Sequence, residues 1–148
     1  MLAQILVGAG VSVLNIAIHA AIMTVVINAV HAVSTRHTAH PQTRLTAIMI
    51  AAVTILMAAH ACEVLVWAGA YMIFDAASVR DNFMYFAFVN YTTLGYGDVT
   101  PAKQWLLLGP ITAMNGVLMF GWSTAVIFEI LRKTMGGSVT PPSAARTS

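Results

Sequence analysis

The sequence predicts an all-α integral membrane protein with three transmembrane helices and one short helix that enters the membrane and returns. Three observations predict this fold class. Of the 148 residues, 59% are hydrophobic and only 8% are charged, whereas a soluble domain carries about 25% charged residues. Three apolar runs are each long enough to cross a bilayer, and a fourth apolar segment is too short. An ordinary soluble enzyme does not fit this composition.

The first run covers residues 1–33 and contains no Asp, Glu, Lys or Arg. As a helix it would be about 50 Å long, which is more than a bilayer requires. It has no basic segment before it and is too long for a cleaved signal peptide. We therefore expect a retained N-terminal transmembrane helix over residues 1–33. Residues 34–44 are polar and contain Pro41, so they predict a loop.

The second run, residues 45–74, is interrupted only by His60 and Glu63. The third run, residues 105–133, contains Pro110, which either kinks a helix or marks its first turn. Each run predicts a transmembrane helix. Between them, the apolar segment within residues 82–92 reaches only about 15 Å as a helix, so it must return to the side from which it entered. Residues 134–148 are rich in Gly and Pro and predict a disordered tail.

Basic residues predict the orientation, because cytoplasmic loops carry an excess of Lys and Arg. A three-span arrangement puts five basic residues on one side and two on the other. The five are Arg36, Arg44, Arg132, Lys133 and Arg146; the two are Arg80 and Lys103. We therefore expect a cytoplasmic C-terminus and loop 34–44, with the N-terminus and the re-entrant segment outside. The scattered basic residues form no patch for nucleic acid.

The re-entrant segment is followed by the sequence Thr92-Thr93-Leu94-Gly95-Tyr96-Gly97-Asp98. This motif resembles the selectivity filter of the potassium channel family. Residues 45–133 as a whole are similar to the two-helix pore module of small bacterial potassium channels. The resemblance implies an outer helix over 45–74, a pore helix over 82–92, a filter over 93–98 and an inner helix over 105–133. Residues 1–33 would be an added helix.

A dehydrated cation needs replacement oxygens, and backbone carbonyls provide them without adding net charge. Glycine adopts the positive φ angles that such a loop requires at little cost, and Gly95 and Gly97 stand in the motif. The resemblance implies that K⁺ is coordinated by the backbone carbonyls of four residues, with the Thr93 hydroxyl as a further ligand. These residues are Thr93, Leu94, Gly95 and Tyr96.

The resemblance also implies residues that support the filter. They are Tyr85 and Phe86, an aromatic pair in the pore helix, together with Gly97 and Asp98. We expect the Asp98 carboxylate to contact the Tyr85 hydroxyl. The helix over 82–92 would direct its negative C-terminal end toward the ion, and Ser78 or Asp75 could cap its start.

Two positions depart from the family pattern. Leu94 stands where valine is commoner, and Val89 stands where some bacterial members have a glutamate. One chain supplies one filter segment, whereas the family's pore needs four. The resemblance therefore implies a homotetramer in the cell (inner) membrane that conducts K⁺ passively and is not an enzyme. A weakly selective cation channel is the alternative.

Several other residues have two readings. Gly116 is either a gating hinge or a site of close helix packing. Thr112, Asn115 and Thr124 could line a hydrated cavity. Glu129 is expected to form a surface ion pair with the basic residues three and four positions later. His31, His37 and His40 are expected in a solvated loop, and Cys62 as a small packing residue. No span has the regularly spaced arginines of a voltage sensor.

Glu63 is the one acidic residue deep in the second run, so it is expected to have a partner. His60, or Asn15 and His19 on the first helix, are the candidates. The group could join helices structurally or respond to pH. A different class of protein remains open from these residues, since His19, His60 and Glu63 could also form a haem or metal site in a membrane redox enzyme.

Overall fold

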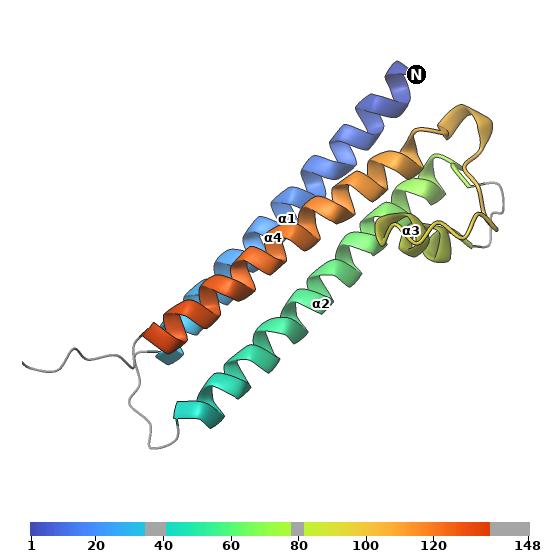
Figure 1. Cartoon of the computed structure of the whole chain (residues 1–148). Helices are drawn as coiled ribbons and strands as arrows, with labels where there is room; N and C mark the ends of the chain where they lie inside the picture. The colour runs from blue at the N-terminus through green and yellow to red at the C-terminus, as the bar shows by residue number, and fades with distance from the viewer. Residues whose placement is uncertain (35–40, 78–81, 137–148) are drawn as a thin grey trace, which may run out of the picture.

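The computed structural model describes residues 1–34, 41–77 and 82–136. The described part of the chain contains three long helices, one short helix and the 3₁₀ turn η2 (Figure 1). In chain order these are α1 (Leu2–Ser34), α2 (Pro41–Ile73), α3 (Phe83–Tyr91), the 3₁₀ turn η2 (Lys103–Trp105) and α4 (Leu108–Gly136). The predicted all-α fold with one short helix between two long ones is confirmed.

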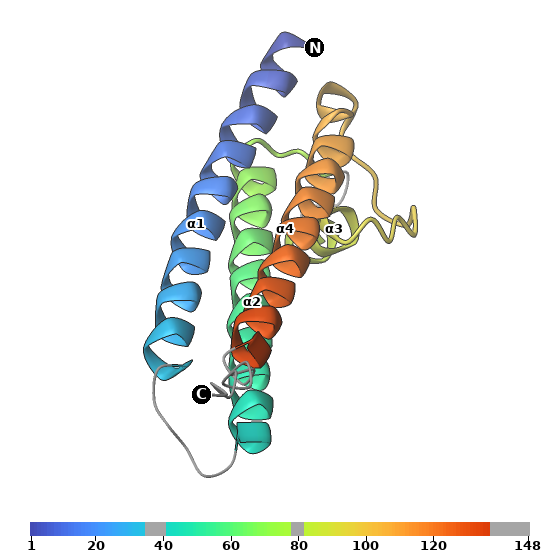
Figure 2. The same cartoon turned by 60° about the vertical axis from the view of Figure 1, so that its left-hand side comes forward.

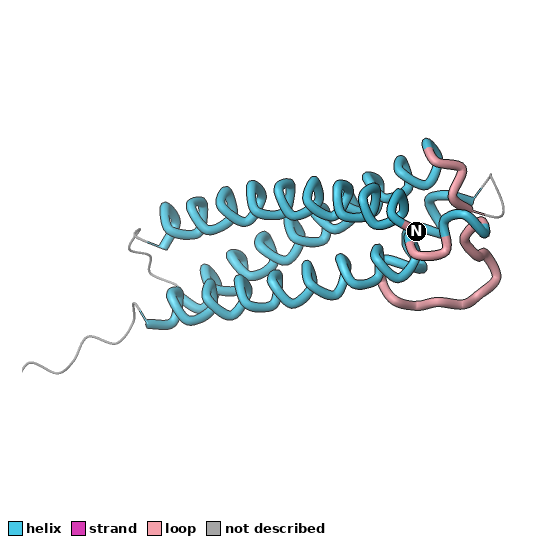
Figure 3. The backbone as a smooth tube through the Cα atoms, turned by 90° about the horizontal axis from the view of Figure 1, so that it is seen from above, coloured by secondary structure: helices cyan, strands magenta, loops and turns pink. Residues whose placement is uncertain are grey.

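The three long helices pack side by side (Figures 1 and 3). Each is long and apolar enough to cross a membrane, over Leu2–Ala32, Gln42–Ile73 and Lys103–Thr134. The N-terminus, α3 and its loops lie at one end of the bundle, and the end of α1 and the start of α2 lie at the other (Figure 1). The chain is therefore an integral membrane protein in which α3 and the loops on both sides of it lie at the same end of the bundle.

Pro41 and Pro110 both lie at helix starts. Pro41 is the first residue of α2, because its missing N–H and fixed φ suit the first turn of a helix. The expected loop 34–44 is correspondingly shorter, and α2 begins four residues before the expected position 45. Pro110 lies in the first turn of α4 and does not kink it. At its other end α4 continues to Gly136, three residues beyond the expected end, while the rest of the predicted disordered tail lies outside the described residues.

A hydrogen bond joins the segment after α2 to the segment before α4. Asp75 ends α2 in a left-handed conformation, with φ 48°, and the Ala76 amide bonds back to the Tyr71 carbonyl at 2.9 Å, as in a Schellman cap. Ala76 in turn accepts a hydrogen bond from the Ala102 amide at 2.9 Å. The N-cap residue of α3 is Asn82, which makes no side-chain cap bond, and Ser78, one of the two expected caps, lies outside the described residues.

Two apolar clusters hold the bundle together. The first lies between α2, α3 and α4 and includes the buried rings of Trp67, Tyr71 and Phe86. The second lies toward the other end, where Met23 of α1 and Leu56 of α2 meet α4. Cys62 is exposed on α2, so the prediction that it is a packing residue is wrong.

Candidate functional site

The helix α3 ends where its run of apolar and aromatic side chains gives way to threonines and glycines. The Thr92 amide and hydroxyl both donate to the Phe88 carbonyl, at 3.0 and 2.7 Å. The Leu94 amide donates to the Val89 carbonyl at 2.9 Å. These bonds use carbonyls that a helix end would otherwise leave without a partner, so they fix the start of the loop relative to α3.

The loop that follows has an alternating backbone. Thr93, Gly95 and Gly97 have φ angles of 61°, 57° and 80°, and the residues between them do not have positive φ. A loop whose backbone carbonyls replace the hydration shell of an ion needs residues at positive φ, which glycine adopts at little cost. The sequence predicted the two glycines, but not Thr93, because a β-branched residue at positive φ is disfavoured. Only the neighbouring structure can hold Thr93 in this state.

The loop is exposed along its whole length in the single chain. All residues from 92 to 98 are exposed, and the large side chains of Leu94 and Tyr96 are 54% and 69% accessible. The connection between α3 and α4 projects away from the bundle (Figure 2). Both side chains are therefore open to other molecules or to other copies of the chain, so this loop is a candidate site of assembly or binding.

The expected contact between Tyr85 and Asp98 is present. The Tyr85 hydroxyl donates to Asp98 Oδ2 at 2.6 Å, and the Val99 amide donates to Asp98 Oδ1 at 3.1 Å. The hydrogen bond from Tyr85 lowers the pKa of Asp98, and the same bond raises the pKa of Tyr85 to about 12. Phe86 takes a different place, because it is buried with its ring 4.7 Å from that of Tyr71.

Gly116 lies where α4 crosses the end of α3. A Cβ atom at this position would come within 2.0 Å of the Tyr91 carbonyl oxygen, which is far inside van der Waals contact. Of the two readings of Gly116, the geometry supports close packing. No such contact exists at Gly121, five residues later, where a Cβ atom would meet nothing within 4 Å.

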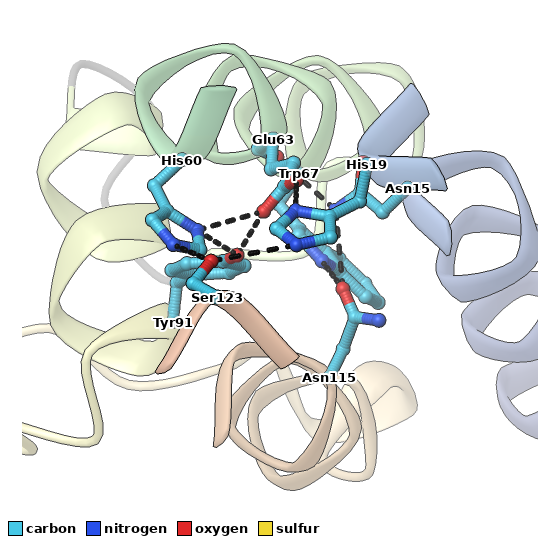
Figure 4. Close-up of polar contacts among 8 residues, drawn as sticks. All are labelled: Asn15, His19, His60, Glu63, Trp67, Tyr91, Asn115 and Ser123. Atoms are coloured by element: carbon cyan, nitrogen blue, oxygen red, sulfur yellow. Dashed lines mark hydrogen bonds and ion pairs between the residues drawn. The ribbon is translucent and has the colours of Figure 1, made fainter. Parts of the chain in front are cut away.

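Glu63 is at the centre of a buried polar cluster that joins α1, α2, α3 and α4 (Figure 4). His19 Nδ1 lies 2.7 Å from Glu63 Oε1, and His60 Nδ1 lies 3.1 Å from Oε2. The Tyr91 hydroxyl donates to Oε2. On the other side of the imidazoles, Ser123 Oγ lies 3.0 Å from His60 Nε2 and 3.4 Å from His19 Nε2. The predicted partners His19 and His60 are therefore confirmed.

A second group of polar bonds extends the cluster. Asn15 Nδ2 donates to the Glu63 carbonyl at 3.3 Å and to Asn115 Oδ1 at 3.1 Å. Trp67 Nε1 donates to the same Asn115 oxygen at 3.1 Å. Asn15 thus contacts Glu63 through its backbone. The sequence did not predict the roles of Tyr91 and Ser123; the one available signal was that polar side chains in apolar helices usually face protein.

Two of the three residues expected to line a cavity lie inside the bundle. Asn115 is 2% exposed in the cluster just described, and Thr112 is fully buried with its Oγ1 2.6 Å from the Tyr71 hydroxyl. The cavity prediction is therefore wrong for both, because Thr112 bonds to Tyr71 of α2 and Asn115 Oδ1 accepts from Asn15 of α1 and Trp67 of α2. Thr124 is exposed and donates to the Phe120 carbonyl at 2.9 Å.

The far end of the bundle carries the expected ion pairs. Glu129 lies 2.9 Å from Arg132 and 3.2 Å from Lys133. Lys133 Nζ also lies 3.0 Å from His31 Nε2. His31 is a residue of α1 and contacts α4, so its prediction as a loop residue is wrong; His37 and His40 lie outside the described residues.

These features together define a class of protein. A short helix and a loop of alternating backbone lie between two membrane-spanning helices, at one end of the bundle, which is the architecture of a membrane pore subunit. A family model described as ion channel matches residues 59–133, which extend from α2 to α4. The chain belongs to this ion channel family. No curated protein and no solved structure matches the chain.

Proposed function

We propose that this chain is the subunit of a potassium-selective channel in which four copies surround one pore. The alternating backbone of the loop carries the proposal. With positive φ at Thr93, Gly95 and Gly97, the carbonyl oxygens of residues 93–96 can be directed toward a common axis. Four chains would then supply rings of oxygens that replace the hydration shell of K⁺.

Three further features support the proposal. The helix α3 ends at the loop, so its negative C-terminal end lies beside the ion path. The Tyr85–Asp98 hydrogen bond fixes the far end of the loop to α3. The exposure of Leu94 and Tyr96 in one chain leaves surfaces for neighbouring copies. In this arrangement Gly97 and Asp98 support the filter, and lipid covers the outer surface.

The test is flux through the purified protein in liposomes. K⁺ flux much greater than Na⁺ flux, with block by Ba²⁺, is the expected result. Comparable Na⁺ and K⁺ fluxes would indicate the weakly selective cation channel instead, and no flux would contradict a pore.

A pair of glycine variants ties that flux to the loop. Gly95→Ala places a Cβ at φ 57°, which costs about 1–2 kcal/mol in each copy, so selectivity or conduction should be lost. Gly69→Ala is the control, since a Cβ there would meet nothing within 4 Å. Equal K⁺ selectivity in both variants would contradict a carbonyl filter at Gly95.

A further inference from the structure

The buried cluster around Glu63 has a charge that its surroundings must balance. Glu63 is 0% exposed in the interior of α2, a helix that spans the membrane. An isolated carboxylate is very costly in such a place. Within the described part of the chain, its ion pairs are both with histidines, His19 and His60. The charge of Glu63 must therefore be balanced by a proton on an imidazole or by a bound cation, unless the carboxyl group itself carries a proton.

The donor atoms of this cluster match those of a transition-metal site. His19, His60 and Glu63 each offer one ligand atom, and these three atoms lie within 4.8 Å of one another. Two imidazole nitrogens and one carboxylate oxygen form a three-ligand set that binds Zn²⁺ with a fourth position open. A tetrahedral Zn²⁺ ion holds its ligand atoms about 3.4 Å apart. Small side-chain rotations would bring the three atoms to that spacing.

The cluster also has partners that orient its ligands. Ser123 Oγ lies 3.0 Å from His60 Nε2 and 3.4 Å from His19 Nε2, so a metal bound at the Nδ1 atoms leaves Ser123 as the partner of the opposite nitrogens (Figure 4). The Tyr91 hydroxyl contacts Glu63 and lies 3.1 Å from His60 Nδ1. Hydrogen bonds of this kind fix ring orientation and increase metal affinity.

We propose that His19, His60 and Glu63 form a buried binding site for one divalent transition-metal ion of the Zn²⁺ class, which joins α1 to the pore module. The site differs in chemistry from the loop at residues 93–96, since imidazole nitrogen favours Zn²⁺ and its neighbours over K⁺, Na⁺ or Mg²⁺. The bound ion would compensate the charge of Glu63. It would also connect α1 to Tyr91, which lies two residues before Thr93.

The experiment uses the full chain in detergent, stripped with chelator and titrated with Co²⁺ as a spectroscopic substitute for Zn²⁺. We expect one Co²⁺ per chain, with the visible absorption of a tetrahedral site, displaced by Zn²⁺. His19→Gln and Glu63→Gln should each weaken binding by at least about 10-fold, and Ser123→Ala by about 10-fold through its partner role. The triple variant His31→Gln, His37→Gln, His40→Gln is the control and should bind as the wild type does.

Two results would overturn the proposal. One is a wild-type chain that takes up no Co²⁺ or Zn²⁺ at millimolar concentration, which would leave a proton as the balancing charge. The other is a signal that disappears in the triple variant. If the Glu63 variant does not fold, X-ray absorption at the zinc edge of the triple variant decides, because the proposal requires two imidazoles, oxygen and no sulfur. The metal titration does not measure ion flux, so its result does not test the proposal that the chain forms a potassium channel.

Discussion

Gly116 shows how one residue limits the packing of two elements. A side chain at this position would overlap the Tyr91 carbonyl, at 2.0 Å from its oxygen. The oxygen belongs to the backbone at the end of α3, so it cannot move without displacing the loop that follows. Small residues allow membrane helices to approach this closely. The sequence alone left Gly116 between a hinge and a packing role because both use the same residue.

We expect Gly116→Ala to destabilise the protein by at least about 1–3 kcal/mol, the usual cost of overpacking. Gly121→Ala is the matched control on the same helix, with nothing within 4 Å of the new Cβ. It should be neutral or slightly stabilising, since alanine is the better helix former. Thermal unfolding in detergent measures both, and equal midpoints would contradict the packing role of Gly116.

The Tyr85–Asp98 hydrogen bond makes a prediction that depends on pH. Because the bond lowers the pKa of Asp98 below its usual 3.8, its stabilisation is present above pH 3.8 and is lost as the pH falls through the lowered pKa. A double-mutant cycle with Tyr85→Phe and Asp98→Asn should therefore show coupling in thermal stability at pH 7.

That coupling should decrease in acid as Asp98 becomes protonated. On the alkaline side it should decrease above pH 10.0, the usual pKa of tyrosine, and be lost as Tyr85 ionises near pH 12. Additive effects of the two substitutions at pH 7 would show that the contact contributes nothing to stability.

At the scale of elements, polar contacts join α1 to α2 and α4 near its start, in its middle and at its end, where His31 Nε2 lies 3.0 Å from Lys133 Nζ. Near its start, Gln4 Oε1 accepts a hydrogen bond from the Leu107 amide at 2.9 Å, just before α4. In its middle, His19 and Asn15 join the cluster around Glu63. Apolar contacts alone do not select one position of α1 along its neighbours in lipid, because lipid tails are as apolar as the side chains. These polar contacts therefore fix the register of α1.

Replacing His19 tests whether its polar contacts stabilise the packing of α1 against the other helices. His19→Ala leaves Glu63 with one imidazole fewer in a buried site, which should cost about 3–5 kcal/mol. Thr24→Ala on the same helix is the control, because Thr24 is exposed and its hydroxyl donates to the Ala20 carbonyl of its own helix. Denaturant or heat unfolding compares the two variants. A His19 variant as stable as the Thr24 variant would show that α1 is held by its apolar contacts.

For the whole molecule, the single chain leaves its most distinctive surface open. The loop of residues 92–98 is exposed, as are Met84 and Phe88 on α3, which are 42% and 44% accessible. A proposed tetramer would cover this surface with neighbouring copies. We expect native mass spectrometry from detergent to give four chains of 15.8 kDa each. A uniformly monomeric or dimeric protein that still conducts ions would contradict this assembly.

Part of the candidate site could be predicted from the sequence because its requirements are local. A loop of alternating backbone needs glycines, so Gly95 and Gly97 were visible as a motif, and a deeply placed Glu63 needed a partner within reach. Thr93 could not be predicted at positive φ, since a β-branched residue disfavours it. Tyr91 and Ser123 were missed for another reason, because they come from α3 and α4 and meet Glu63 only after the helices pack.

The sequence by itself determined the number of spans, the short returning helix and the end of the bundle at which the loop lies, because these follow from the length of apolar runs and the bilayer that they must cross. Only the tertiary structure decided which face of each helix is inside. The long helices are apolar on nearly all sides, so their periodicity marks no buried face. The packing of the helices against one another selects the buried face of each helix. This is why Thr112 and Asn115 lie against α2 and why Glu63 contacts His19.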